Sequence, residues 1–266
     1  MSGPVAEILD ELCGSWEQAA RGPIAFKGLR GRRTYEQQVA IVLGLASHVM
    51  ETARLIHGIG AGGKLSVTSM PLVRSALESA VPGIWIAQVE DAADAFVHRH
   101  SRQEELLLEQ FRSSGDPTWT RLVEAMEPHS YNLAPTSSHH QAKSFESLCK
   151  DLEFGSTIYA LYRTLSGWSH ASVRITDEYI VDASKLGAEG KAPFAVLTTA
   201  APFEGQDTWL FITAMSALWA SRSVNFITQD KTQRGLLQSA ARRLGVPLNL
   251  NPSQASFKRR ALRKFR

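Results

Sequence analysis

The sequence predicts an all-α protein, a multi-helix bundle, on three observations. Apolar residues recur at spacings of three and four over most of the 266 residues, which is the period of an amphipathic helix. Glycine and proline gather between these stretches, where they end one helix and start the next. Hydrophobic residues form 44% of the chain, enough to bury a core without disulfides or a structural metal. We therefore expect one helical domain over residues 1–250, followed by a basic C-terminal tail over residues 251–266.

The first half of the chain is predicted as a succession of helices. Thr34 is a suitable N-cap for the longest of them, and Pro71 is tolerated in the first turn of the next. Pro82 and Gly83 are expected to kink or break that helix. The predicted helices cover residues 5–20, 34–59, a stretch that begins at Ser69, 91–113 and 116–126.

The second half is predicted to be more varied. Residues 129–143 lack periodicity and read as a loop, whereas the stretch from 158 to 170 is helical and residues 174–181 continue as helix. Glycine and proline around a β-prone run predict a small β-hairpin insertion around residues 180–205. The helix over residues 207–227 is apolar on nearly every side, so it lies either at the centre of the bundle or in an interface. A basic helix over residues 232–244 ends at Gly245.

Positive charge is concentrated at the C-terminal end. Asp230 is the last of the 26 acidic residues, and cations alone follow it. A cationic segment attracts polyanions such as RNA, although a solvated basic end without a ligand is also common. The residues expected to bind RNA are Lys258, Arg259, Arg260, Arg263, Lys264 and Arg266.

Cysteine usage and hydropathy predict a cytoplasmic protein. Cys13 and Cys149 stand far apart without metal-ligand spacing, and no signal peptide precedes them. Two free thiols in a reducing compartment are the simplest interpretation. No apolar run approaches the roughly 20 residues of a spanning helix, so no membrane contact is expected.

One stretch carries chemistry-capable side chains on a single predicted face. At 100° per residue, a helix over residues 159–170 places four polar side chains within about 60° of one another, opposite an apolar side. These four residues are Tyr159, Arg163, Ser166 and His170. An imidazole that exchanges protons near neutral pH, beside a guanidinium that holds a phosphate, is suited to metal-free RNA cleavage. The alternative is structural: Arg163 pairs with a carboxylate, and His170 hydrogen-bonds a carbonyl at a helix break near Gly167.

The segment from Arg163 to His170, with six intervening residues, resembles the motif of the HEPN superfamily of helical bundles. Together with Arg74 and Glu78 on an earlier helix, it also resembles uncharacterised bacterial helical proteins near that superfamily. The resemblance implies a metal-independent endoribonuclease of toxin or phage-defence type, without a cofactor. Arg163 and His170 would be the catalytic pair, supported by Tyr159, Ser166, Arg74 and Glu78.

The resemblance also implies partners. Catalytic members of the superfamily are usually dimers in which both subunits face one cleft, so a homodimer is expected, to which the apolar helix over residues 207–227 would contribute. An antitoxin or a neighbouring defence protein is a further expected partner. Arg74 and Glu78, four residues apart, are also spaced for a simple intrahelical ion pair.

Two other function classes remain open on the sequence. The first is a non-catalytic binding or scaffold module for nucleic acid or a protein partner. The second is a di-metal bundle enzyme that uses helical imidazoles and carboxylates, namely His48, Glu51, Glu78, Asp94 and His98. Such bundles carry Glu-x-x-His on two helices, whereas this chain has the reversed order at His48 and Glu51, so no metal is expected.

Overall fold

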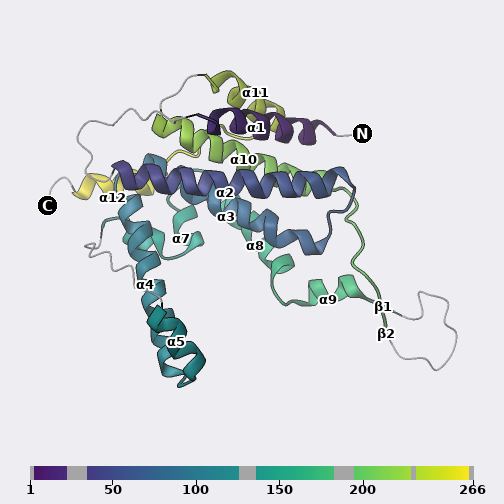
Figure 1. Cartoon of the computed structure of the whole chain (residues 1–266). Coiled ribbons are helices and arrows are strands. Elements are labelled where there is room, and N and C mark those ends of the chain that lie inside the picture. The colour runs from purple at the N-terminus through teal and green to yellow at the C-terminus, as the bar shows by residue number, and fades with distance from the viewer. Residues whose placement is uncertain (1–2, 23–34, 126–135, 183–194, 229–231, 264–266) are drawn as a thin grey trace.

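Four long helices form the centre of the protein in a computed structural model, which describes residues 3–22, 35–125, 136–182, 195–228 and 232–263. They are α1 (Pro4–Ala20), α2 (Tyr35–Ala61), α3 (Met70–Gln88) and α10 (Asp207–Thr228). α10 packs against α1, α2 and α3, and α2 also packs along α3 (Figure 1). The predicted all-α multi-helix bundle is confirmed.

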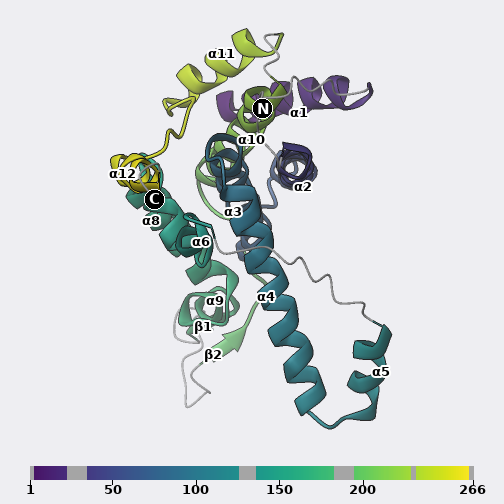
Figure 2. The ribbon, with the colours of Figure 1, turned by 90° about the vertical axis from the view of Figure 1, so that its left-hand side faces the viewer.

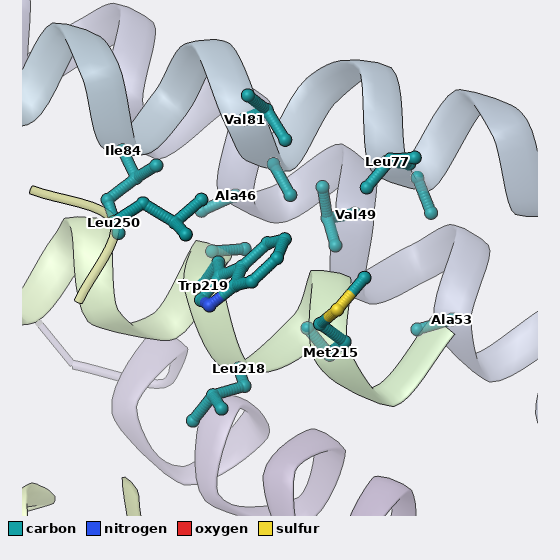
Figure 3. Close-up of a cluster of buried hydrophobic side chains, with 14 of the residues drawn as sticks. Ala46, Val49, Ala53, Leu77, Val81, Ile84, Met215, Leu218, Trp219 and Leu250 are labelled. Carbon is teal, nitrogen blue, oxygen red and sulfur yellow. The ribbon is translucent and has the colours of Figure 1, made fainter. Parts of the chain in front are cut away.

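The core lies where α2, α3 and α10 meet. Trp219 of α10 is 2% exposed, and its indole Nε1 donates a 3.0 Å hydrogen bond to the carbonyl of Pro247. Figure 3 shows the Trp219 ring between the side chains of α2 and α3, with Leu250 beside it. Small residues on α2, such as Ala46 and Ala53, leave room for this ring and for Met215. Burial of large side chains against small ones is the interlocking that a dense core requires.

The remaining helices surround this centre. A 3-10 turn, η1 (Val67–Ser69), precedes α3, and the two short strands pair antiparallel, with Val181 opposite Val196. α4 and α5 project from the bundle, and the strands project from another side (Figures 1 and 2). The other elements are α4 (Ala92–Ser113), α5 (Pro117–Ala125), α6 (His139–Ala142), α7 (Phe145–Cys149), α8 (Gly155–Ser169), α9 (Val173–Tyr179), β1 (Ile180–Asp182), β2 (Ala195–Leu197), α11 (Arg234–Leu244) and α12 (Gln254–Arg263).

Several helix boundaries differ from the sequence-based expectation. α3 is not broken at Pro82 but continues to Gln88, because nearly all of its second half is buried between α2 and α10. Burial of that face offsets the hydrogen bond that proline cannot donate. The predicted loop over residues 129–143 contains the short helix α6 in its described part. α11 ends at Gly245 as predicted, with Gly245 in the left-handed conformation at φ 67°.

Two helices, α2 and α10, are long and apolar enough to cross a membrane by length and composition, contrary to the expectation that no segment would be. In the fold, 78% of the α10 segment and 44% of the α2 segment are buried inside the protein. An apolar core helix has the same composition as a spanning helix. Because α10 uses its apolar surface within the chain, that surface does not argue for a dimer interface.

Both cysteines are buried, and their burial gives a testable property. Burial raises the pKa of Cys13 from 9.0 to about 11 and that of Cys149 to about 12. Because the thiolate is the reactive form, the folded protein at pH 8 is expected to react with Ellman's reagent far more slowly than the unfolded chain. Both thiols should react promptly after unfolding in guanidinium chloride. Rapid modification of either thiol in the folded protein would contradict this burial.

The same shifts predict a pH dependence of stability. Above pH 9 the unfolded chain releases thiol protons that the folded state still holds. Stability from this source is therefore complete below pH 9 and is lost as the pH rises towards about 12. Guanidinium melts at pH 8 and pH 10.5 measure the loss, and a variant with Cys13→Ala and Cys149→Ala should lose less.

Candidate functional site

The turn before α8 fixes where this helix begins. Phe154 adopts the left-handed conformation, with φ 58°, and its side chain is 58% exposed. Gly155 has no room for a side chain, since a Cβ there would lie 1.8 Å from the carbonyl oxygen of Cys149. From this start, Ile158 and Leu165 face the core and attach α8 to α3. The opposite side of α8 is left for polar groups.

α8 ends at the histidine that the sequence singles out. His170 is the C-cap of α8, with an extended backbone (φ −120°, ψ 158°), and its N–H donates to the carbonyl of Ser166 at 3.2 Å. Two residues later, the Ser172 hydroxyl accepts from the N–H of Ile175 and caps α9. His170 therefore stands in the connection between two helices, where its side chain is exposed.

Arg74 of α3 is the direct partner of His170. Its Nη1 hydrogen-bonds the imidazole Nε2. Its Nη2 donates to the carboxylate of Glu78 at 3.0 Å and to the hydroxyl of Tyr162 at 3.1 Å, and its guanidinium carbon lies 5.0 Å from the Tyr162 ring centre. We call Arg74, Glu78, Tyr162 and His170 the Arg74 cluster.

The hydrogen bond from Arg74 fixes which ring nitrogen of a neutral His170 imidazole carries the proton. A guanidinium has donors only, so the Nε2 of His170 accepts the hydrogen bond and the ring proton of a neutral imidazole is on Nδ1. The side chain of Arg74 is only 14% exposed, and its Nε is buried without a hydrogen-bond partner among the described residues. A largely buried cation is thus held next to an imidazole nitrogen at the protein surface, an arrangement suited to binding a phosphate and accepting a proton from a neighbouring hydroxyl.

Arg163 belongs to a separate set of contacts. Hydrogen bonds from Lys150 and Tyr159 lower the pKa of Glu146, with smaller contributions from the charges of Lys150 and Arg163. The hydrogen bond to Tyr159 also raises the pKa of Arg163. We call Glu146, Lys150, Tyr159 and Arg163 the Glu146 network. Lys150 and Arg163 are exposed and Glu146 is only partly buried, so the ion pair between Glu146 and Lys150 adds little to stability.

Among the described contacts, Arg163 and His170 have different partners and not each other. Arg163 and His170 are seven positions apart in the chain, which is roughly 10 Å along a helix. Ser166 uses its hydroxyl to donate to the carbonyl of Tyr162 at 2.8 Å, so it too is committed elsewhere. Arg74 and Glu78, predicted only as supporting residues, form the site with His170.

Tyr162 is the member of the Arg74 cluster that the sequence-based selection missed. It lies four residues before Ser166 on α8, outside the predicted polar stripe, and its ring packs against Phe145 with 4.6 Å between ring centres. A tyrosine that packs by its ring and hydrogen-bonds by its hydroxyl is common at partly buried sites. Its position directly before Arg163 was a signal that the sequence offered.

The predicted basic tail is largely helix α12, and its cations do not all face outwards. Arg259 forms an ion pair with the buried carboxylate of Asp151 and donates to the Ser138 hydroxyl at 3.1 Å. Asp151 also accepts from the Trp85 indole at 2.8 Å and from the Ser256 hydroxyl at 3.1 Å. Arg259 is thus a structural residue, which corrects its assignment to RNA binding. The side chain of Arg263 and all of Lys264 and Arg266 lie outside the described residues.

The di-metal alternative has no ligand set in the described part of the chain. No three His, Cys, Asp or Glu side chains there come close enough to hold a metal ion. His48 instead hydrogen-bonds the hydroxyl of Ser75 through Nε2, at 2.9 Å. His98 and His139 meet edge to face, with 4.6 Å between ring centres. Burial, followed by the charge of His98, lowers the pKa of His139.

Comparison with known proteins gives a family but no function. No curated protein and no solved structure matches this chain. The model of a family of unknown function, DUF5677, matches residues 39–186. The matched segment runs from α2 past β1, contains the whole Arg74 cluster and the Glu146 network, and leaves out α10 to α12. Since it covers more than half of the 266 residues, the chain belongs to the DUF5677 family.

Proposed function

We propose that this protein is a metal-independent endoribonuclease whose reacting groups are His170 and Arg74. The observation that carries the proposal is the hydrogen bond between the half-buried Arg74 guanidinium and the Nε2 of the exposed His170. Cleavage of RNA without a metal needs a base for the ribose 2′-hydroxyl and a cation for the phosphate, and these are the two groups in contact here. The resemblance of the α8 segment to the HEPN motif supports the same reaction class.

The cleavage step follows from the position of the unprotonated ring nitrogen, the Nε2 of His170. When a phosphodiester binds, the Arg74 guanidinium moves its Nη1 donor from His170 to a phosphate oxygen, and Nε2 becomes free to take the proton of the 2′-hydroxyl. The 2′-oxygen then attacks phosphorus, the bond to the 5′-oxygen breaks, and the leaving oxygen takes a proton from water. The products are a 2′,3′-cyclic phosphate and a 5′-hydroxyl end.

Glu78 and Tyr162 act as positioning residues in this proposal. Both accept hydrogen bonds from Nη2 of Arg74, so they hold one edge of the guanidinium while Nη1 points to His170. A guanidinium held in place before the reaction loses less freedom when charge develops on phosphorus. Arg163, which precedes His170 in the chain and lies within α8, binds a neighbouring phosphate and takes no part in the reaction itself.

The test is cleavage of a labelled, unstructured RNA in EDTA, with analysis of the product ends. We expect cyclic phosphate ends from the wild type and none from His170→Ala. Cleavage that is unchanged in His170→Ala would place the activity elsewhere or in a contaminant. Absence of cleavage in the wild type, with RNA binding retained, would favour the non-catalytic binding module.

A further inference from the structure

The outward side of α12 combines an exposed aromatic ring with positive charges. Phe257 is 51% exposed, and the guanidinium carbon of Arg260 lies 4.9 Å from the centre of its ring. Lys258 is exposed next to it, and no acidic residue occurs in α12. We call Phe257, Lys258 and Arg260 the α12 platform. The ring contact described for Phe257 is with Arg260, which is itself only partly buried, so this aromatic side chain lies at the protein surface.

The inward side of α12 holds this platform in a fixed orientation. Ser256 is fully buried and donates to Asp151, to which Arg259 is also ion-paired. Just before the helix, the Ser253 hydroxyl donates to the carbonyl of Lys150, and the Asn251 carbonyl accepts from the N–H of Glu153. The platform is therefore part of the folded protein and lies next to the turn that starts α8.

We propose that the α12 platform binds unpaired nucleic acid, with a base stacked on Phe257 and neighbouring phosphates held by Lys258 and Arg260. Proteins that bind single strands combine aromatic rings for base stacking with cations that follow the backbone. The absence of acids on α12 removes the repulsion that a phosphate backbone would otherwise meet. This inference rests on the proposed function and extends it by naming single-stranded RNA as the substrate class.

The position of the platform relative to His170 agrees with one continuous strand. The segment that leads into α12 contacts the turn before α8, and α12 lies beside α8 in Figure 2. His170 is the C-cap at the other end of α8. The 15 residues of α8 span roughly 22 Å, a distance that a single strand of several nucleotides can cover. The exposed Arg163 lies between the two ends on the same helix.

A lipid surface fits the platform less well. A helix that lies in a membrane interface buries a whole apolar face, whereas the described outward side of α12 has one large apolar side chain, Phe257. The other side is attached to the protein through Ser256 and Arg259. Duplex RNA fits less well too, because its bases are stacked on each other and not available to a ring.

Binding is tested apart from cleavage, in protein that carries His170→Ala. Fluorescence anisotropy measures affinity for a labelled single-stranded RNA and for a duplex of the same sequence. Adding Phe257→Ala is expected to weaken single-strand binding roughly tenfold or more, and duplex binding much less. Phe257→Tyr should retain the affinity. The matched control is Leu197→Ala, which removes another exposed apolar side chain, 82% exposed on β2, and should change nothing.

The outcomes separate this inference from the proposed function. Equal single-strand affinities with and without Phe257→Ala would overturn the α12 platform, even if His170 is needed for cleavage. If Phe257→Ala lowers single-strand affinity but the wild-type protein does not cleave RNA, the platform is supported and the nuclease is rejected. If Phe257→Ala abolishes binding to phosphatidylserine–phosphatidylcholine vesicles and leaves RNA binding unchanged, the platform is overturned in favour of a lipid site.

Discussion

Replacing Arg259 with alanine is expected to lower the free energy of unfolding by about 3–5 kcal/mol, because it leaves a buried carboxylate without its cation. The Asp151 side chain is 2% exposed, and that of Arg259 is 18% exposed. Removal of the guanidinium also takes a donor from Ser138, which is fully buried. Denaturant melts of the wild type and the variant measure the change.

The matched control for this prediction is Arg243→Ala. Arg243 forms an exposed pair with Glu11, at 2.7 Å, and such pairs are worth about 0–1 kcal/mol. A decrease in the free energy of unfolding of less than about 1 kcal/mol for Arg259→Ala would contradict the structural role of the ion pair between Asp151 and Arg259, which we call the Asp151 pair. The double variant Arg259→Met with Asp151→Asn should recover part of the stability, because it removes both charges.

The Asp151 pair changes how RNA binding by the C-terminal end has to be tested. If the C-terminal end were a free basic tail, deletion of residues 258–266 would weaken RNA binding and flatten its salt dependence. Since the deletion also removes Arg259, it would leave the buried carboxylate of Asp151 without its cation and destabilise the fold. Single substitutions of Lys258 and Arg260 keep the Asp151 pair and measure binding alone.

Replacing Arg74 is expected to slow RNA cleavage by about 10²–10³-fold, whereas replacing Arg163 should slow it less than about tenfold. Arg74 contacts His170 directly, and Arg163 contacts Tyr159. Arg74→Lys keeps the charge but cannot donate to Glu78, Tyr162 and a phosphate in the same plane, so it should recover little. Single-turnover rates in EDTA, on variants with unchanged melting curves, give the comparison.

The opposite order of effects would contradict the assignment. If Arg163→Ala abolishes cleavage and Arg74→Ala does not, the reacting pair is the one that the helical stripe predicts, and the Arg74 cluster is structural. Tyr162→Phe supplies a further check, because it removes the hydroxyl that holds Arg74 but keeps the ring against Phe145. It should reduce the rate while leaving RNA affinity unchanged.

Helix identity was largely predictable because it depends on local spacing. The apolar period identified α1, α2 and α10 within a few residues of their observed ends, and Gly245 marked the end of α11. The predicted break at Pro82 was wrong because the sequence shows only the local effect of proline, a missing backbone hydrogen bond. The burial that offsets this loss depends on the packing of α3 against α2 and α10. A cap signal for α12 was present, since Pro252 precedes Ser253, and the Ser253 hydroxyl accepts from the N–H of Ser256.

The site was less predictable because its contacts join distant segments. Arg74 and His170 are 96 residues apart, and Arg259 and Asp151 are 108 apart. Periodicity along one helix cannot show which neighbouring helix supplies a partner. The helical projection also assumed that His170 lies inside α8, whereas Ser172 caps a new helix and leaves His170 in the connection.

The most direct test of the Arg74 cluster is the single-turnover cleavage rate of an unstructured RNA in EDTA, for the wild type and His170→Ala prepared side by side, with and without added imidazole. We expect the variant to lose about 10²–10⁴-fold in rate, the usual contribution of general acid–base catalysis, and to recover part of it when imidazole is added. A His170→Ala variant that cleaves at the wild-type rate, or a wild type without activity, would contradict the account.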